Sequence, residues 1–506
     1  MRRIIKKMVL LGITLMSLPA VSHANGVVLL NGEVVNQDTN QDFAFIQFDA
    51  SWKNSWNDGV NKDALWVFAK YSVDEGETWN HATLALSGTN PNGFSSGTGT
   101  GVDMVVPNDL KGVFIQRSYS GVGDVSTTGI QMVWDYGVDG LSDQDVYGKL
   151  ILKLFGIEMV YVPSGSFYAG DGAVSAYSFK QGSSDVDPWF INSNNAINVD
   201  NSASNSFYYV SSGYAGEDAT GSSFTISSGF PKGYSSFYVM KYEISEAEWI
   251  GFFNTLTTTQ KSNRDITGAN GKNTDAVFKR NTVSWTSGDA TTDRGDRACG
   301  YLSWMDGAAF ADWAGLRPVS ELEYEKSARG TQTVVSGEYA WGSTSLTSGT
   351  SISGSEDGSE TISTSGANAI YNNVTFSGGD GGLGPVRTGI FAKSTTGRVQ
   401  SGSGYFGSME LSGNLSERVV TVGNATGRTF TGTHGDGEIT TNGYADNSDW
   451  PGFDGSQVTT ADGSGIRGGS WSDTSSKLQI SDRQEAAQNL SSRQSRFGFR
   501  AARTAP

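Results

Sequence analysis

The sequence predicts an N-terminal all-β sandwich followed by an α+β region that is rich in loops. Up to about residue 155, short β-branched or aromatic runs alternate with Gly, Asn, Asp and Ser, and none of them has helical spacing. Helical spacing appears only later in the chain, between stretches of Ser, Thr and Gly. Composition is the third observation, because 66 of the 506 residues are glycine and only 17% are charged.

Residues 1–24 have the pattern of a secretory signal peptide. Basic residues occur between Arg2 and Lys7, a short apolar run covers Met8–Leu18, and small residues precede the predicted cleavage before Asn25. The apolar run is too short to span a bilayer, and no later run reaches the ~20 apolar residues that a spanning helix needs. We therefore expect a protein that is secreted or held at the cell surface and has no transmembrane segment.

Residues 25–155 are predicted to form the β-sandwich. The main strand candidates are residues 43–48, 64–71, 112–115 and 130–134. Such short strands bury their apolar faces when two sheets pack together. Three tryptophans in this part, Trp52, Trp56 and Trp66, have two interpretations. We favour packing in the core over the alternative, a sugar-stacking surface.

Residues 156–506 are predicted to combine strands, helices and long loops. Residues 237–242 are typical of a strand. Three helices are expected after serines, and two of these serines have the spacing of a capping box, in which a carboxylate three residues later returns a hydrogen bond. The two capping pairs are Ser245 with Glu248 and Ser320 with Glu323. The third serine, Ser303, starts a helix that is expected to reach Ala314.

Charge and cysteine content exclude several classes of function. The formal net charge is −16, which argues against nucleic acid as a partner because phosphate binding needs a basic face. Cys299 is the single cysteine of the chain, so no intramolecular disulfide can form. A lone cysteine is most often a small buried apolar residue.

Eight short motifs resemble, in order, the landmarks of the formylglycine-generating enzyme family, also known as the sulfatase-modifying factor domain. They occur at residues 159–167, 242–245, 302–315, 317–330, 339–342, 409–417, 467–471 and 498–500. The resemblance covers residues 156–506 and leaves residues 25–155 unexplained. It implies a fold related to C-type lectins, with many loops and little regular structure.

The resemblance also implies a site that this chain cannot complete. Enzymatic members hold copper(I) with two cysteines shortly after the Gly-Gly-Ser-Trp motif, which is residues 468–471 here. Counting from that motif places Asp473 and Leu478 at the two sulfur positions. Neither side chain replaces a thiolate, the soft ligand that copper(I) prefers. Other relatives use several histidines for iron, but only His81 and His434 lie beyond the predicted signal peptide.

Calcium is the cofactor that the resemblance supports. Calcium takes six to eight oxygen ligands and suits irregular loops. The segment Gly413–Glu417 resembles one calcium loop of the family, and Asn368 with Asp380 marks a looser match to the other. The ligand set implied is Asn414, Leu415, Glu417, Asp380, Gly382, Asn368 and Ala369. The alternative for Asn414 and Glu417 is that they cap a turn.

The function favoured by these observations is that of a secreted, non-catalytic binding protein, in which a calcium-stabilised scaffold presents ligand-binding loops. An extracellular protein or a carbohydrate is the expected ligand, because adaptable polar side chains suit both. Candidate contact residues are Trp471, Asp473 and Arg483 in the segment 471–496, together with His434 in a glycine-flanked loop.

Other functional classes stay open. A structural component of the cell surface or matrix would self-assemble through both regions. An oxidoreductase of the formylglycine-generating type is disfavoured by the missing cysteine pair. An enzyme with an unrecognised site would need convergent carboxylates, and Glu321, Glu323 and Glu325 are close in sequence. On a helix, however, residues two apart face different directions.

Overall fold

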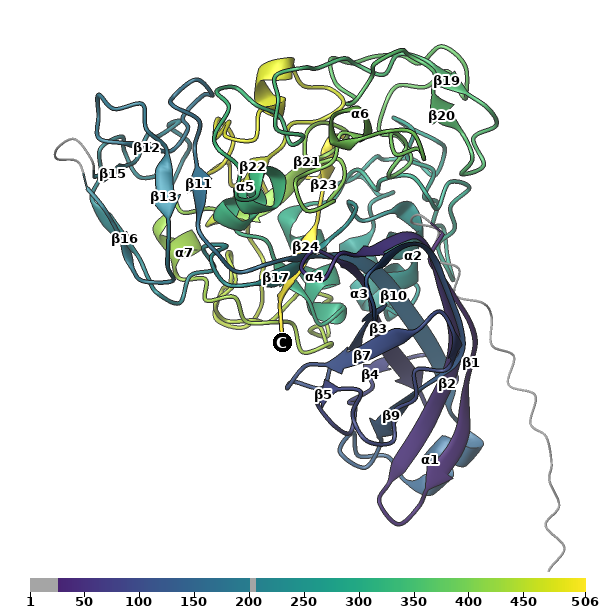
Figure 1. Ribbon diagram of the computed structural model, residues 1–506. Helices are drawn as coiled ribbons and strands as arrows, with labels where there is room; N and C mark the ends of the chain where they lie inside the picture. The colour runs from purple at the N-terminus through teal and green to yellow at the C-terminus, as the bar shows by residue number, and fades with distance from the viewer. Residues whose placement is uncertain (1–25, 201–205) are drawn as a thin grey trace, which may run out of the picture.

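The structure is a computed structural model that describes residues 26–200 and 206–506. The predicted signal peptide lies outside the described residues. The described chain is rich in strands and loops, with few helices (Figure 1). None of the helices in these two ranges has both the length and the apolar character that a bilayer crossing requires.

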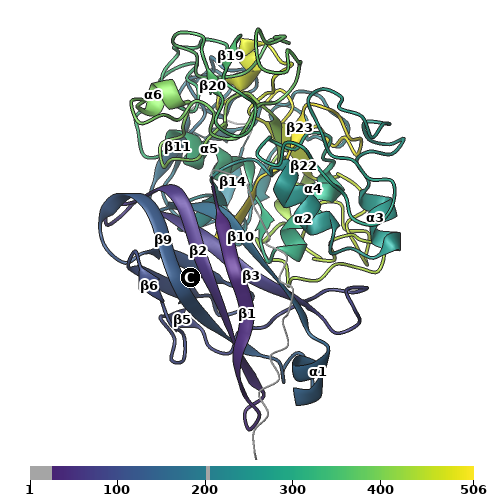
Figure 2. The same ribbon diagram turned by 90° about the vertical axis from the view of Figure 1, so that its right-hand side faces the viewer.

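Two antiparallel sheets dominate the first third of the chain. One has the strand order β1-β2-β9-β6, and the other has the order β18-β24-β17-β10-β3-β8-β7-β5, with β4 beside β3. Figure 2 shows β1, β2 and β9 lying side by side below the loops of the C-terminal region. The strands are β1 (Val28–Asp38), β2 (Phe43–Asn57), β3 (Asp63–Ser72), β4 (Asn80–His81), β5 (Gly88–Thr89), β6 (Thr98–Gly99), β7 (Val102–Val106), β8 (Val113–Arg117), β9 (Gly121–Asp135), β10 (Ile151–Val162), β17 (Phe237–Met240), β18 (Arg317–Pro318) and β24 (Ala501–Thr504).

Strand β3 is buried at every position because both of its faces are covered. Leu65 and Val67 point into a cluster with residues of the first sheet. Trp66 and Phe68, on the opposite face, belong to a cluster that includes residues of the later helices. The Trp66 indole N–H donates to the Ala314 carbonyl oxygen at 2.8 Å. The N-terminal strands and the C-terminal region therefore share a core.

Strand β10 joins the two regions directly. Its residues 151–160 pair with β3, and its residues 159–162 pair with β17. The domain boundary expected between residues 155 and 156 falls inside this strand. One sheet thus continues from the N-terminal strands to β24, near the end of the chain.

The three expected helices are confirmed, each with a capping box formed by its serine. They are α2 (Glu246–Phe253), α4 (Trp304–Trp313) and α5 (Glu321–Arg329). The sequence pattern did not predict α1 (Asp143–Gly148), because a helix of six residues is too short to show a period. The other helical segments are α3 (Thr258–Arg264), α6 (Arg398–Ser401), α7 (Ala425–Arg428) and the 3-10 helix η1 (Ser475–Leu478).

Short strands connect the remaining loops. They form four small sheets, with the orders β11-β13, β12-β15-β14-β16, β19-β20 and β22-β21-β23. Their bounds are β11 (Phe167–Ala169), β12 (Lys180–Gln181), β13 (Trp189–Ile191), β14 (Ile197–Val199), β15 (Phe207–Tyr208), β16 (Phe224–Ile226), β19 (Ile352–Ser353), β20 (Thr361–Ile362), β21 (Ser416–Val420), β22 (Ser464–Arg467) and β23 (Phe497–Gly498).

Helix α5 is buried along its whole length, although it carries three glutamates. Arg467 donates to Glu321 at 2.9 Å and to Glu325 at 2.6 Å. Arg483 donates to both oxygens of Glu321, at 2.7 and 3.0 Å. Burial alone acts to raise the pKa of Glu321, but Arg483 and Arg467 outweigh it and hold that pKa below its ordinary value. These carboxylates are paired with cations and tie distant loops to the helix.

The Glu321 ion pairs give a test of how much this network stabilises the fold. The substitution Glu321→Gln leaves Arg483 and Arg467 buried with one carboxylate fewer, so we expect a loss of about 3–5 kcal/mol in the free energy of unfolding. Because the folded-state pKa of Glu321 is depressed, this stabilisation is present at pH 7 and is lost as the pH falls below 4.5. Urea titration at pH 7 measures the change, with the exposed Glu33→Gln as matched control. Equal losses in the two variants would contradict the prediction.

Candidate functional site

Asp473 and Leu478, the two positions that the resemblance assigns to sulfur ligands, lie beside and in η1. Leu478 is fully buried in a hydrophobic cluster that also contains Tyr324 and Trp341. Asp473 accepts hydrogen bonds from the Ser470 hydroxyl at 2.6 Å and the Ser470 backbone N–H at 3.0 Å. Its carboxylate also lies 3.4 Å from Arg496. An aliphatic side chain and a neutralised carboxylate cannot hold a soft metal ion.

Cys299 lies in the core, where its thiol is fully buried. Burial, followed by the charge of Glu246, raises the thiol pKa well above its ordinary value. The thiolate, which is the nucleophile and metal ligand, is therefore suppressed. This agrees with the expected apolar role of Cys299.

The loop Gly413–Glu417 is held by a buried glutamate, Glu243. Asn414 has a positive φ of 62°, and its side-chain amide donates to Glu243 at 2.5 Å. The Leu415 backbone N–H donates to the other oxygen of Glu243 at 2.8 Å. The Asn414 side-chain oxygen accepts from the Val386 backbone N–H at 2.9 Å. Burial, then the nearby Glu410 and Glu417, raise the pKa of Glu243 well above its ordinary value.

Glu417 is paired with an arginine. The Nε and Nη2 atoms of Arg500 donate to one Glu417 oxygen, at 2.9 and 2.7 Å. Arg500 also donates to the Met240 and Met409 carbonyl oxygens, both at 2.6 Å. The guanidinium thus neutralises this carboxylate and disfavours a second cation beside it.

Three of the residues implied as calcium ligands line one small cavity. They are Asn368, Ala369 and Asn414, and Glu410 lies in the same wall. The Gly389 backbone N–H donates to Glu410 Oε1 at 2.8 Å, whereas Oε2 is buried and has no hydrogen-bond partner among the described residues 26–200 and 206–506. Burial raises the pKa of Glu410 to about 7. Sequence reasoning did not select Glu410, although it lies four residues before Asn414.

Asp380 and Gly382 line a different cavity. The Asp380 carboxylate lies 3.2 Å from Arg297 and 3.5 Å from Arg280. Burial alone acts to raise the pKa of Asp380, but Arg280 and other donors outweigh it and lower that pKa. The two cavities therefore differ: the one beside Asn414 contains the Glu410 oxygen that has no partner among the described residues, whereas the Asp380 carboxylate in the other is paired with arginines.

The four candidate ligand contacts do not share one surface. Trp471 and Asp473 lie in the same loop, where the Trp471 indole donates to the Ser495 carbonyl oxygen at 3.2 Å. Arg483 is buried against Glu321. His434 lies beside Asp109, 3.6 Å from its carboxylate, and accepts from the Thr504 backbone N–H at 3.0 Å. Burial lowers the pKa of His434 to about 4.

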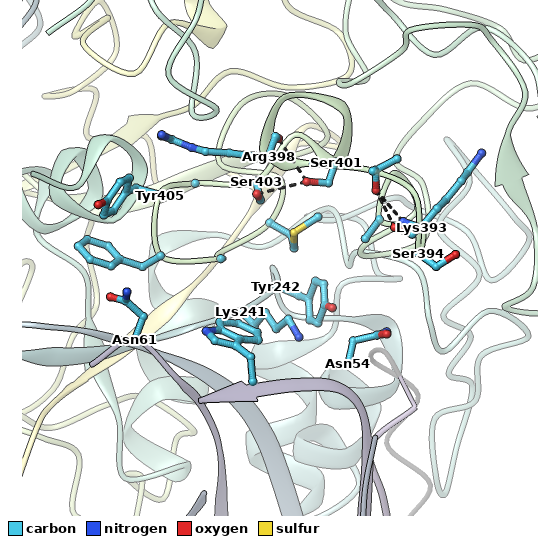
Figure 3. Close-up of a pocket in the computed structure, with 18 of the residues that line it drawn as sticks. Asn54, Asn61, Lys241, Tyr242, Lys393, Ser394, Arg398, Ser401, Ser403 and Tyr405 are labelled. Atoms are coloured by element: carbon cyan, nitrogen blue, oxygen red, sulfur yellow. Dashed lines mark hydrogen bonds between the residues drawn. The ribbon is translucent and has the colours of Figure 1, made fainter. Parts of the chain in front are cut away.

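A cleft of about 620 Å³ lies between the turn that links β2 to β3 and the loop 392–409 (Figure 3). We refer to it below as the cleft. Its wall from the N-terminal strands includes Trp56, Asp58 and Asn61, and its opposite wall includes Lys393, Arg398 and Tyr405. Lys241 and Tyr242, which follow β17, lie between the two walls.

The cleft contains a charged side chain, Lys241, that is held in place by a buried carboxylate. Lys241 forms an ion pair with the buried Glu158 and lies 4.8 Å from the centre of the Trp56 ring. Tyr242 is 4% exposed and also lines the cleft. Burial raises the pKa of Tyr242 well above its ordinary value, so the hydroxyl keeps its proton. Sequence reasoning weighed Trp52, Trp56 and Trp66 as a sugar-stacking surface and favoured core packing; Trp52 and Trp66 are buried, and Trp56 lines the cleft.

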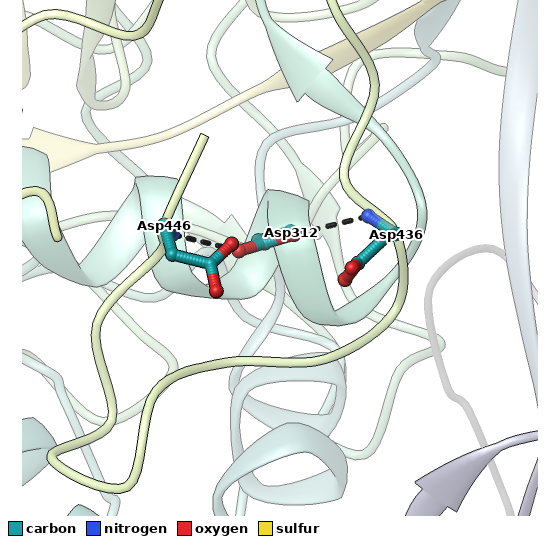
Figure 4. A group of neighbouring side chains, drawn as sticks. All are labelled: Asp312, Asp436 and Asp446. Carbon is teal, nitrogen blue, oxygen red and sulfur yellow. Dashed lines mark hydrogen bonds between the residues drawn. The ribbon is translucent and has the colours of Figure 1, made fainter. Parts of the chain in front are cut away.

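A cluster of three aspartates was also missed by sequence reasoning (Figure 4). Carboxylate oxygens of Asp312, Asp436 and Asp446 all lie within 4.8 Å of one another. Asp312 is buried at the end of α4 and accepts from the backbone N–H groups of Asp436 and Asp446, both at 3.2 Å. Burial, then the charges of Asp436 and Asp446, raise the pKa of Asp312 well above its ordinary value.

Repulsion in this cluster predicts a stabilising substitution, Asp446→Asn. The pKa of Asp446 is raised by burial and then by Asp436, so the folded state favours the protonated carboxyl. The stability that this protonated group contributes is lost as the pH rises above the ordinary pKa of 3.8. We expect the variant to be more stable than the parent at pH 7 by about 0.5 kcal/mol, a small gain because solvent screens the exposed group. Urea unfolding measures this, and the gain should shrink as the pH falls toward 3.8. An equal gain from the exposed Asp293→Asn would contradict the local cause.

Comparison with known proteins identifies the C-terminal region. The family described as sulfatase-modifying factor enzyme 1-like domain matches residues 231–505, which is more than half of the chain. No curated protein sequence matches this chain. The matched span begins before β17, ends in the residue after β24, and contains the loop Gly413–Glu417 and both positions discussed for sulfur. The chain therefore belongs to the sulfatase-modifying factor enzyme 1-like family.

Proposed function

We propose that this chain is a secreted, non-catalytic binding protein that uses the sulfatase-modifying factor scaffold to hold ligand-binding loops. One observation carries the proposal. Asp473 and the fully buried Leu478 occupy the positions where the family resemblance places sulfur ligands. The single thiol, Cys299, is buried in the core with its ionisation suppressed. Copper(I) chemistry of the family's kind needs paired thiolates.

The cleft supports a binding role and supplies a place for the ligand. Aromatic rings, amides, hydroxyls and charged groups converge there from segments that are far apart in sequence, such as Trp56 and Tyr405. Pockets that bind small ligands typically combine aromatic walls with a few fixed polar groups. Loops held by a rigid scaffold often carry such sites.

The absence of the thiol pair predicts a negative result in a sensitive assay. We expect no conversion of a cysteine-containing sulfatase peptide to formylglycine by the purified full chain, with copper(I), oxygen and reductant present. Mass spectrometry of the peptide detects the aldehyde product. The chain with Asp473→Cys and Leu478→Cys together serves as a comparison for copper binding. Formation of the aldehyde by the unaltered chain would overturn the proposed function.

We further propose that calcium binds in the small cavity lined by Asn368, Ala369, Glu410 and Asn414. Support comes from the chemistry of the donors, since carboxylate, amide and backbone oxygens are the ligands calcium prefers. Glu410 Oε2 is buried without a hydrogen bond to any described residue, which costs free energy unless a cation or water compensates. Glu417 and Asp380 are already neutralised by arginines and are weaker candidates.

The calcium proposal predicts that Glu410 and Asp380 respond differently to substitution. About 1 mM calcium should raise the Tm of the parent chain, because a ligand bound only to the folded state stabilises it. Glu410→Gln should abolish this shift, whereas Asp380→Asn should retain it. The shift should be larger at pH 8 than at pH 6, since the pKa of Glu410 is about 7 and calcium needs the ionised carboxylate.

Thermal unfolding with and without a chelator measures these shifts, and elemental analysis counts bound calcium. A parent chain that gains no stability from calcium would refute the calcium proposal. A shift that survives Glu410→Gln but disappears in Asp380→Asn would place calcium in the other cavity.

A further inference from the structure

The lining of the cleft differs in charge from the chain as a whole. The sequence has 52 acidic and 36 basic side chains. The lining of the cleft nevertheless includes Lys241, Lys393 and Arg398 but one carboxylate, Asp58. Glu158 neutralises Lys241 from behind, which leaves two cations, Lys393 and Arg398, and one carboxylate in the lining. On a strongly acidic chain, such a local reversal favours an anionic ligand.

The protein holds Arg398 more tightly than Lys393. Arg398 is fixed, because its Nη2 donates to the Ala328 and Ala340 carbonyl oxygens, at 2.9 and 2.8 Å. Its guanidinium also lies 5.3 Å from the centre of the Tyr405 ring. Lys393 is exposed on the loop, and its ammonium donates to the Ile362 carbonyl oxygen at 3.1 Å. A fixed guanidinium and the ammonium of an exposed, long side chain can together accommodate carboxylates along an extended ligand.

Aromatic groups line the same cleft. Trp56 is partly buried, and the backbone of Gly407 lies so close that an added Cβ would come within 2.7 Å of the indole ring. Glycine at 407 thus allows the loop 392–409 to approach the tryptophan. Tyr405 is also partly exposed in this lining. Rings of this kind present apolar faces on which the C–H faces of sugar rings can pack.

Polar side chains complete the lining. The Tyr242 hydroxyl, the Asn54 side chain and the Trp56 indole belong to this lining. Figure 3 shows Tyr242 and Asn54 on the same side of the cleft as Lys241. A ligand rich in hydroxyl groups can satisfy these donors and acceptors.

We propose that the cleft binds an acidic oligosaccharide, with Trp56 and Tyr405 packing against sugar rings and Lys393 and Arg398 pairing with carboxylates. This assignment builds on the proposed binding function and names its ligand class. A saccharide fits better than an acidic peptide, because common peptide sites use an apolar groove or a free sheet edge. The cleft instead offers amides, hydroxyls and aromatic rings from turns and loops.

Isothermal titration calorimetry on the full mature chain tests the assignment with three probes of equal length. These are a hexamer of galacturonic acid, a neutral hexamer of glucose and hexaglutamate. We expect the galacturonate hexamer to bind at least about tenfold more tightly than the other two, a difference of about 1.4 kcal/mol. Its affinity should fall as salt rises, because exposed charges are screened.

Two substitutions locate the binding in the cleft. Trp56→Ala and Lys393→Glu should each weaken galacturonate binding by about tenfold or more, through lost ring packing and reversed charge. Tyr147→Ala and Lys149→Ala are matched controls, since both side chains are exposed outside the cleft and should leave binding unchanged. Lys393 lies on an exposed loop, so Lys393→Glu tests the assignment even if Trp56→Ala fails to fold.

Each contrary outcome identifies what is wrong. Tighter binding of hexaglutamate would replace the saccharide with an acidic peptide, and equal binding of the neutral hexamer would remove the role of charge. Galacturonate binding that both substitutions leave intact would place the site elsewhere. Failure to bind galacturonate overturns this assignment alone, whereas the non-catalytic function fails only if the chain forms formylglycine.

Discussion

The C-terminal region depends on one constraint, which is that buried charges must be paired. Helix α5 lies in the interior with Glu321, Glu323 and Glu325, and arginines from β18, β22 and later loops neutralise these carboxylates. Arg317 and Arg467 lie in short strands and Arg483 lies in a loop, so the ion pairs connect separate segments of the region to one helix. Because removing one partner leaves a charge in a low-dielectric interior, the loops cannot move independently of the helix. The three glutamates therefore tie separate segments of the region to the helix.

The need to pair buried charges also distinguishes the candidate calcium sites from one another. Glu417 and Asp380 came from the family resemblance, and each carboxylate is occupied by an arginine. Glu410, which sequence reasoning missed, keeps one buried oxygen without a hydrogen bond to the described chain, beside Asn414. At the positions of the sulfur ligands, Leu478 completes an apolar cluster and Asp473 is bound by serine and arginine groups. At the two positions that the family resemblance assigns to sulfur ligands, this chain therefore has groups that pack or pair.

Local sequence signals were sufficient for the helices and for the family. Ser245 with Glu248 and Ser320 with Glu323 predicted capping boxes that the structure contains, because capping depends on residues within one turn. The order of short motifs predicted the family, which the match to residues 231–505 confirms. The place of Trp56 in the wall of the cleft could not be predicted from local sequence signals. Its neighbours in the cleft, such as Tyr405, lie about 350 residues further along the chain, and no local pattern records that distance.

The sequence by itself determined the thiol content of this protein, since a chain with one cysteine cannot supply two thiolates however it folds. It also determined the helix starts and the strand-rich character of the first 155 residues. Only the tertiary structure decided that β10 runs through the expected boundary, that Arg500 neutralises Glu417, and that the turn after β2 faces the loop 392–409. The physical reason is that residue content and short-range spacing are fixed along the chain, whereas ion pairs, shared cores and clefts depend on which distant segments pack together.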